Sequence, residues 1–138
     1  AVMAMFKEIG DFCEENRGDE KLTFFTKGLK KGLNDLQAAT MWFMQNAMTN
    51  PNQAGAGAYH YMHVMGIVAL GLMWLRMASV AAAALAEGKG DTPFYQAKLV
   101  TARYFAERFM PDAGALRRKI EAGSDAMMAL PPEAFGIG

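Results

Sequence analysis

The stretch GIVALGLMWLRM, residues 66–77, limits the possible folds of this chain more than any other segment. Arg76 is its only charged residue, and no Asp, Glu, Lys or Arg occurs between residues 36 and 75. On a helical wheel, the apolar residues of the predicted helix 53–86 occupy every side. A helix that is apolar on every face lies either at the centre of a helical bundle or in a membrane.

Length and charge distinguish the bundle from the membrane. Pro51 and the polar, glycine-rich segment NPNQAGAG at residues 50–57 divide the uncharged interval. Arg76 falls in the middle of any window of about 20 residues that would span a bilayer, where an arginine costs a few kcal/mol even on lenient scales. We therefore expect a helix that is buried in protein, and no membrane span.

Four other segments carry the three-and-four spacing of apolar residues that is typical of amphipathic helices. These segments are residues 2–17, 22–49, 92–110 and 112–130. Asp19 is the expected N-cap of the second helix, and Asp91 followed by Pro93 is typical of a helix start. Pro111 and Pro131 mark helix ends, because proline cannot continue the hydrogen-bond ladder.

The predicted fold class follows from these segments. No segment has convincing strand character, so we expect an all-α, up-and-down bundle of about five helices around the central apolar helix. A chain of 138 residues is of the usual size for one domain. We therefore predict a single helical domain over residues 1–138.

Charge and cysteine content exclude several classes of protein. Fourteen Lys and Arg balance fourteen Asp and Glu, so no net field attracts nucleic acid or an anionic membrane surface. Cys13 is the only cysteine, and we expect it to act as a small buried hydrophobe in a reducing compartment. Since the N-terminal residues also lack the pattern of a secretory signal, the predicted location is cytoplasmic.

The sequence contains no recognisable catalytic or metal centre. His60 and His63 are three residues apart and can point to one side of a helix, but no glutamate precedes either at the Glu-x-x-His spacing of di-iron bundles. Phosphate-binding glycine motifs and the nucleophile motif Gly-x-Ser-x-Gly are also missing from the sequence. We predict no catalytic residue, no cofactor-binding residue and no metal ligand in this chain.

Arg76 and Lys98 stand out because they occur where charge is costly. Arg76 interrupts the apolar helix, and Lys98 falls between Phe105 and Phe109 on the wheel of the next helix. Both are candidate buried charges. Three interpretations are open: their alkyl stems cover apolar surface while the charged heads reach water, they form buried contacts that fix helix register, or they bind an anionic ligand.

Phe24 and Trp42 form a candidate interface. They lie together on the wheel of the second helix, away from its main apolar stripe and beside Lys31 and Asp35. Five turns separate them, or roughly 27 Å at 1.5 Å per residue. Large aromatic side chains on a polar face indicate a contact. Its partner is another helix of the bundle, a second copy of the chain or a neighbouring domain.

An ordered set of residues, mostly in the second half of the chain, resembles a known family. The set comprises the run ATMWF at residues 39–43, Trp74-Leu75-Arg76 with Ala78, Phe94-Tyr95 with Ala97-Lys98-Leu99, Ala102-Arg103, Pro111, Ala122-Gly123 and Leu130-Pro131. It is similar to the C-terminal domain of a bacterial subgroup of acyl-CoA dehydrogenases that includes enzymes resembling 3-methylmercaptopropionyl-CoA dehydrogenase. The likeness begins at about the second helix, and the first helix carries little of it.

The resemblance implies an accessory domain of a larger enzyme. Enzymes of this family use FAD to take a proton from the α-carbon and a hydride from the β-carbon of an acyl-CoA, and they pass electrons to electron-transfer flavoprotein. Their catalytic carboxylate and flavin-binding motifs belong to preceding domains, so no such residue is carried over to this chain. The lack of an initiating methionine agrees with the expectation of a C-terminal fragment of a larger flavoenzyme.

Three functional hypotheses follow. In the first, the helical domain packs on the catalytic domains of the parent chain or joins subunits of a homo-oligomer, and it contributes no reacting group. In the second, a free-standing helical interaction domain binds a partner through Phe24 and Trp42. In the third, Arg76 and Lys98 bind an anion such as a CoA phosphate.

Overall fold

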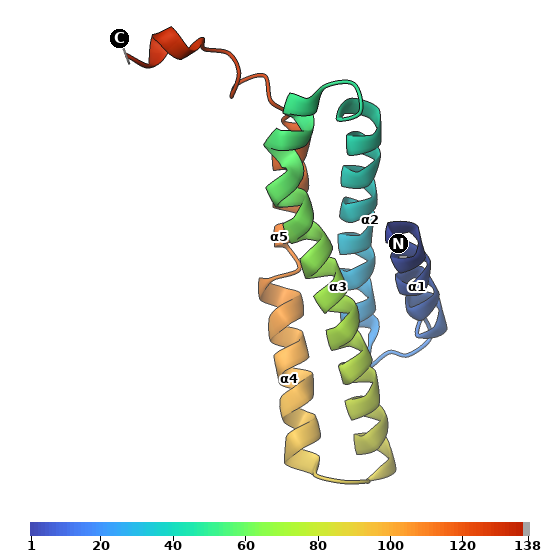
Figure 1. Cartoon of the computed structure of the whole chain (residues 1–138). Coiled ribbons are helices and arrows are strands. Elements are labelled where there is room, and N and C mark those ends of the chain that lie inside the picture. Colours follow the sequence, from blue (N-terminus) through green and yellow to red (C-terminus); the bar gives the residue numbers. More distant parts are fainter. Residues whose placement is uncertain (137–138) are drawn as a thin grey trace.

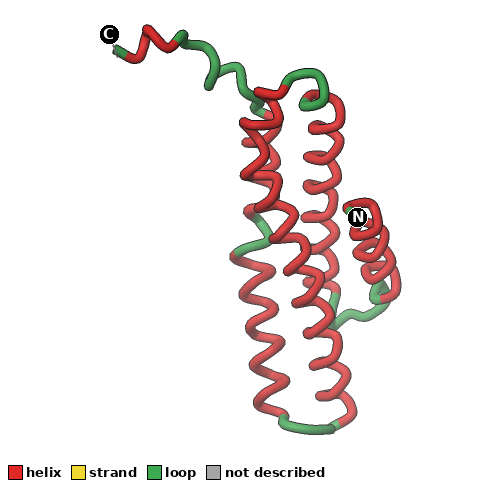
Figure 2. The backbone as a smooth tube through the Cα atoms, viewed as in Figure 1, coloured by secondary structure: helices red, strands yellow, loops and turns green. Residues whose placement is uncertain are grey.

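Helices account for most of the chain (Figure 1). The computed structural model describes residues 1–136. The elements are α1 (Val2–Glu15), α2 (Thr23–Asn46), α3 (Pro51–Glu87), α4 (Thr92–Arg108), α5 (Asp112–Glu121) and the short 3-10 helix η1 (Pro132–Phe135). No strand occurs in this described part, and loops join the helices (Figure 2). The prediction of an all-α fold is confirmed.

The long helix α3 lies at the centre of the packing. Its 37 residues extend over roughly 55 Å at 1.5 Å per residue, and it contacts α2, α4 and α5. At its start, the side chain of Asn50 accepts a hydrogen bond from the N–H of Asn52, and Pro51 occupies the first turn. Gly88 ends the helix in the left-handed conformation, at φ +67°. The prediction of a helix at 53–86 is therefore confirmed, with small shifts at both ends.

The helices α4 and α5 lie end to end and run in the same direction (Figure 1). Together they are antiparallel to α3, and both also contact α2. The bundle therefore has four rods, namely α1, α2, α3 and the α4–α5 pair, which corrects the expected up-and-down order of about five helices. Pro111 explains the break, because it lacks the N–H that would continue the ladder of α4.

Met110, in the junction between α4 and α5, fills a notch between α2 and α3. Two glycines form this notch. A Cβ added at Gly71 would lie 2.7 Å from Met110 Sδ, and one added at Gly32 would lie 2.5 Å from Met110 Cε. Since either would displace the buried methionine, the two glycines let the junction approach both helices closely.

The last helix is shorter than predicted. It ends well before residue 130, because Gly123 adopts the left-handed conformation at φ +74°. The N–H of Ser124 then donates to Oε1 of Gln53, 2.8 Å away at the start of α3. Met127 and Leu130, which the sequence placed on this helix, are exposed in a segment that leads away from the bundle (Figure 1).

The two expected N-caps differ in outcome. Asp91 caps α4, since its side chain accepts a hydrogen bond from the N–H of Phe94 at 3.2 Å. Asp19 does not cap α2, because its Oδ1 accepts from the N–H of Lys21 at 3.0 Å and closes a turn before the helix. Leu22 is the residue that precedes α2. A short aspartate side chain that bonds to the nearby backbone favours such a turn over helix.

The hydrophobic core follows the contact between α2 and α3 and reaches α1 on one side and α5 on the other. Its almost completely buried side chains include Ile9 of α1, Leu36 of α2, Val64 and Val68 of α3, and Ile120 of α5. Burial of an aliphatic side chain of this size contributes about 1.5–3 kcal/mol. Residues far apart in the sequence therefore hold the rods together.

Among the described residues, α3 is the one helix long and apolar enough to cross a membrane by length and composition. Its most apolar 18-residue window has a mean hydropathy of 1.8, and 39% of that window is buried. The core helix of a soluble protein passes the same test. The absence of a membrane span stays a prediction, supported by the packing of α3 against three other helices.

Candidate functional site

One face of α3 carries an almost wholly apolar stripe that no other described helix covers. We call these residues the α3 seam: Tyr59, His63, Gly66, Leu70, Met73, Met77, Val80 and Ala84. All are exposed or half-buried, and Tyr59, Met73 and Val80 are 68%, 57% and 65% exposed. The expectation that the bundle surrounds this helix is wrong on this face. The buried residues of α3, such as Val64 and Val68, lie on its other side.

A groove runs along the edge of the seam, between the second half of α3 and the start of α4. Its volume is about 310 Å³, and its lining is almost wholly apolar. The lining residues are Arg76, Met77, Val80, Ala81, Phe94, Tyr95 and Lys98. The fold thus brings the two charges that the sequence singled out to one place, at the rim of an apolar groove.

Arg76 is not a buried charge. Its side chain is 47% exposed and pairs with the carboxylate of Glu8 on α1, which is 51% exposed. The guanidinium carbon also lies 5.7 Å from the centre of the Phe12 ring. The expectation of burial is wrong because α1 covers only part of the neighbouring surface of α3. The ion pair instead ties α1 to the centre of the bundle.

The ion pair between Arg76 and Glu8 is expected to contribute little to stability. Arg76→Gln and Glu8→Gln should each lower the free energy of unfolding by less than about 1 kcal/mol, because half-exposed pairs are screened by water. Urea unfolding of the two single variants and the double variant measures the coupling. A loss above about 3 kcal/mol for either single change would indicate a desolvated pair and contradict this assignment.

Lys98 is half-buried, in agreement with the interpretation that its alkyl stem covers apolar surface. Its Nζ lies 5.2 Å from the centre of the Phe94 ring, and its alkyl stem lines the apolar groove. The two cations therefore lie at the same rim, but Arg76 is already paired with Glu8. The anion-binding hypothesis stays a prediction, and apart from Tyr95 the groove lining gives it no further polar side chain.

Phe24 and Trp42 find partners inside the domain. The Phe24 ring is 41% exposed, and the guanidinium carbon of Arg103 on α4 lies 4.5 Å from its centre. Trp42 is half-buried against the core and meets Phe43 edge to face at 5.5 Å. The geometry agrees with another helix of the bundle as the partner. An intermolecular role for these two residues stays a prediction.

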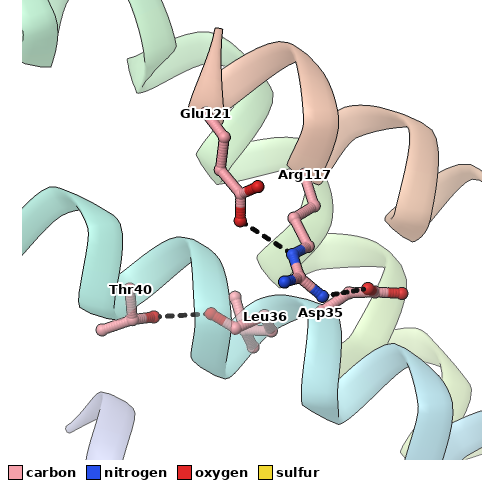
Figure 3. A network of polar contacts seen from close by, with 5 residues as sticks. All are labelled: Asp35, Leu36, Thr40, Arg117 and Glu121. Carbon is pink, nitrogen blue, oxygen red and sulfur yellow. Dashed lines mark hydrogen bonds and ion pairs between the residues drawn. The ribbon is translucent and has the colours of Figure 1, made fainter. Parts of the chain in front are cut away.

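A polar contact between α2 and α5 was not predicted from the sequence. Figure 3 shows Arg117 of α5 donating to Oδ1 of Asp35 at 3.2 Å and to Oε1 of Glu121 at 2.8 Å. The hydrogen bonds to Glu121 and Asp35 raise the pKa of Arg117, so its charge is fixed. Because 82 positions separate Arg117 from Asp35, no local sequence signal indicates this pair. Its role is to hold α5 against α2.

No described residues form a cluster typical of catalysis or metal binding. Within residues 1–136, no group of three or more His, Cys, Asp or Glu side chains could hold a metal ion. His60 is half-buried, with its Nδ1 unpaired, whereas His63 is exposed and contacts the Tyr59 ring at 4.4 Å. Burial raises the pKa of the Cys13 thiol, which disfavours the reactive thiolate.

The comparison with protein families identifies the chain. The model of the family described as "Acetyl-CoA dehydrogenase C-terminal like" matches residues 5–131. The chain belongs to this family. A broad-specificity linear acyl-CoA dehydrogenase of Mycobacterium tuberculosis is 32% identical over 136 residues, which are 93% of this chain and 22% of that protein.

The acetyl-CoA dehydrogenase C-terminal-like domain thus spans about a fifth of the length of the relative that it matches. The match begins at residue 5, so it includes most of α1, where the sequence itself showed little likeness. The open α3 seam is the feature of this chain that bears on contacts with neighbouring domains. A domain that forms part of a longer protein needs a surface for its neighbours, and exposed apolar patches mark such surfaces.

Proposed function

We propose that this chain is an accessory C-terminal helical domain of an FAD-dependent acyl-CoA dehydrogenase. In this role it packs on the catalytic body or joins subunits, and it supplies no reacting group. The observation that carries the proposal is the family match over residues 5–131. The open α3 seam supports a role in packing, because it offers an apolar surface rather than a set of reacting side chains.

The described residues do not fit a flavin site of their own. The groove between α3 and α4 has a volume of about 310 Å³, and the groove between α2 and the α4–α5 junction about 370 Å³. A dinucleotide as large as FAD needs a pocket toward the upper end of the usual ~300–1,000 Å³ range, with convergent polar groups. The first groove is almost wholly apolar, and the second is lined by Lys31, Asp35 and Arg118, of which Lys31 and Arg118 are exposed to water.

Finer features of the parent protein belong to the same proposal. By resemblance, the parent is a cytoplasmic homo-oligomer that passes electrons to electron-transfer flavoprotein. Its subgroup is the one that resembles 3-methylmercaptopropionyl-CoA dehydrogenase, on the strength of the ordered residues from Trp74 to Pro131. Assays of the full-length protein with acyl-CoA substrates of different chain types test this assignment.

A flavin measurement tests the proposal directly. The purified 138-residue chain should be colourless and should oxidise no acyl-CoA, whereas the full-length product of its native gene should carry flavin absorbance and reduce an electron acceptor. The full-length protein serves as the positive control for cofactor supply during expression. A flavin-yellow 138-residue chain, or a colourless and inactive full-length protein, would refute the proposal.

The alternative is a free-standing interaction domain. The sequence of the native gene distinguishes it from the accessory domain of a larger enzyme. If the reading frame upstream of the codon for Ala1 continues through a flavoenzyme body, the accessory role stands. A start codon immediately before Ala1 would instead favour a free-standing domain. The contact between Phe24 and Arg103 within the bundle leaves the α3 seam as the better candidate surface in both cases.

A further inference from the structure

The α3 seam has the spacing of a coiled-coil interface. Its eight members, from Tyr59 to Ala84, follow one another in alternating steps of four and three residues. This average period of about 3.5 residues keeps side chains on one side of a helix, where they pack as knobs against a second helix. The seam runs over roughly 38 Å at 1.5 Å per residue, and it contains no Asp, Glu, Lys or Arg. Its natural partner is another long helix.

We infer that the α3 seam packs against the α3 seam of a second copy of this chain. The two helices run antiparallel about a two-fold axis near Leu70. The contact itself joins two copies of this domain. Only its assignment to subunit association in the parent enzyme rests on the proposed function. A two-fold contact uses the same patch on both copies, so the patch must be complementary to itself.

The order of large and small residues meets that requirement. With the axis near Leu70, Met73 of one copy lies opposite Gly66 of the other. An added Cβ at Gly66 has no heavy atom within 4 Å, so the glycine leaves a hollow for the methionine side chain. The same axis places the two Leu70 side chains together and His63 opposite Met77. Met73 thus faces a small residue, and His63 faces a flexible one.

The groove beside the seam supplies a socket for the partner helix. Met77 and Val80 belong both to the seam and to the groove lining. The two-fold axis brings Tyr59 of the second copy to this end of the seam. Tyr59 is 68% exposed, and its ring is of a size that an apolar groove of about 310 Å³ can receive. Symmetry gives two such contacts in each dimer.

Charge and area favour a second copy as the occupant. The cations at the groove rim have neighbours within their own chain, since Arg76 pairs with Glu8 and Lys98 lies over Phe94. Arg76 is therefore neutralised within its own chain, and the Lys98 ammonium, which has no carboxylate partner among the described ion pairs, lies at the groove rim rather than in the seam. The exposed side chains of the seam and the groove rim together offer on the order of 600 Å² per copy, at the lower end of the ~600–1,000 Å² per partner of standard interfaces.

Sedimentation velocity over a range of concentrations measures the association. The 138-residue chain should form a dimer at micromolar concentration. Met73→Glu should raise the dimer dissociation constant by about 100-fold or more, because two carboxylates would enter an apolar contact. The matched control is Gln37→Glu, which adds a carboxylate at an exposed position of α2 and should leave the constant unchanged. Circular dichroism checks that both variants stay helical.

Cysteine cross-linking tests the direction of the helices. In a Cys13→Ser background, Leu70→Cys should give an oxidised dimer in high yield. A mixture of Tyr59→Cys and Val80→Cys chains should give a cross-link between position 59 of one chain and position 80 of the other. Cross-links of 59 with 59 would indicate parallel helices and overturn the proposed geometry.

The remaining outcomes also decide the proposal. A chain that stays monomeric, with seam cysteines protected from alkylation only in the full-length protein, would show that the catalytic body covers the seam and would overturn the dimer. An equal change in the dimer dissociation constant for Met73→Glu and Gln37→Glu would also overturn the dimer. Neither result depends on flavin, so a failure of the dimer is distinguishable from a failure of the proposed function, which shows as a colourless full-length protein.

Discussion

Leu36→Ala is expected to lower the free energy of unfolding by about 3 kcal/mol. Leu36 is 0% exposed and belongs to the core cluster that joins α2 to the other helices. Alanine would leave a cavity that the surrounding side chains refill only in part. A drop in the melting temperature on the order of 10 °C should accompany the loss. Urea unfolding followed by circular dichroism measures the effect.

The neighbouring position gives the control for this experiment. Gln37 is exposed on the same helix, so Gln37→Ala should change the free energy of unfolding by no more than about 0.5 kcal/mol. All proteins must be compared at one concentration, because association of the native state adds to the apparent stability. A loss below about 1 kcal/mol for Leu36→Ala would show that this region of the core is not closely packed.

Gly57→Leu is expected to destabilise the domain by about 2 kcal/mol. At Gly57, α3 passes between α2 and α5, and an added Cβ would lie 2.9 Å from Phe43 Cζ and 3.4 Å from Ile120 Cγ2. The aromatic ring cannot move aside without disturbing its own packing. The steric cost therefore exceeds the gain of about 1 kcal/mol that helix propensity gives when glycine is replaced. Thermal unfolding measures the net change.

Gly55 provides a matched control two residues away on the same helix. An added Cβ there has no heavy atom within 4 Å. Gly55→Leu should therefore stabilise the domain by roughly 0.8 kcal/mol through helix propensity alone. Opposite signs at the two positions would establish that a close helix approach is what requires glycine at Gly57. Equal effects at both positions would contradict the packing described for this end of the bundle.

A division between core and surface explains how this domain can serve a larger protein. Buried aliphatic residues hold the rods together, and the polar contact between Arg117 and Asp35 fixes α5 on α2. The α3 seam remains free for a partner. Stability and association therefore depend on different surfaces of the bundle. Changes such as Leu36→Ala and Met73→Glu should affect them separately.

The sequence by itself determined the helical character and most helix positions. The spacing of apolar residues and the signals at Pro51, Asp91 and Pro111 depend on neighbours a few positions away, which is the range over which helix formation is decided. The ordered residues from Trp74 to Pro131 also pointed to the family that the comparison then identified.

Only the tertiary structure decided which side of each helix is covered. On a wheel, the residues of the seam and the buried residues Val64 and Val68 are equally apolar, so periodicity cannot tell the open face from the core. In the same way, Arg76 interrupts an apolar run but is half-exposed, because its surroundings come from α1. Burial depends on segments that are distant in the sequence, and the order of residues along one helix does not specify them.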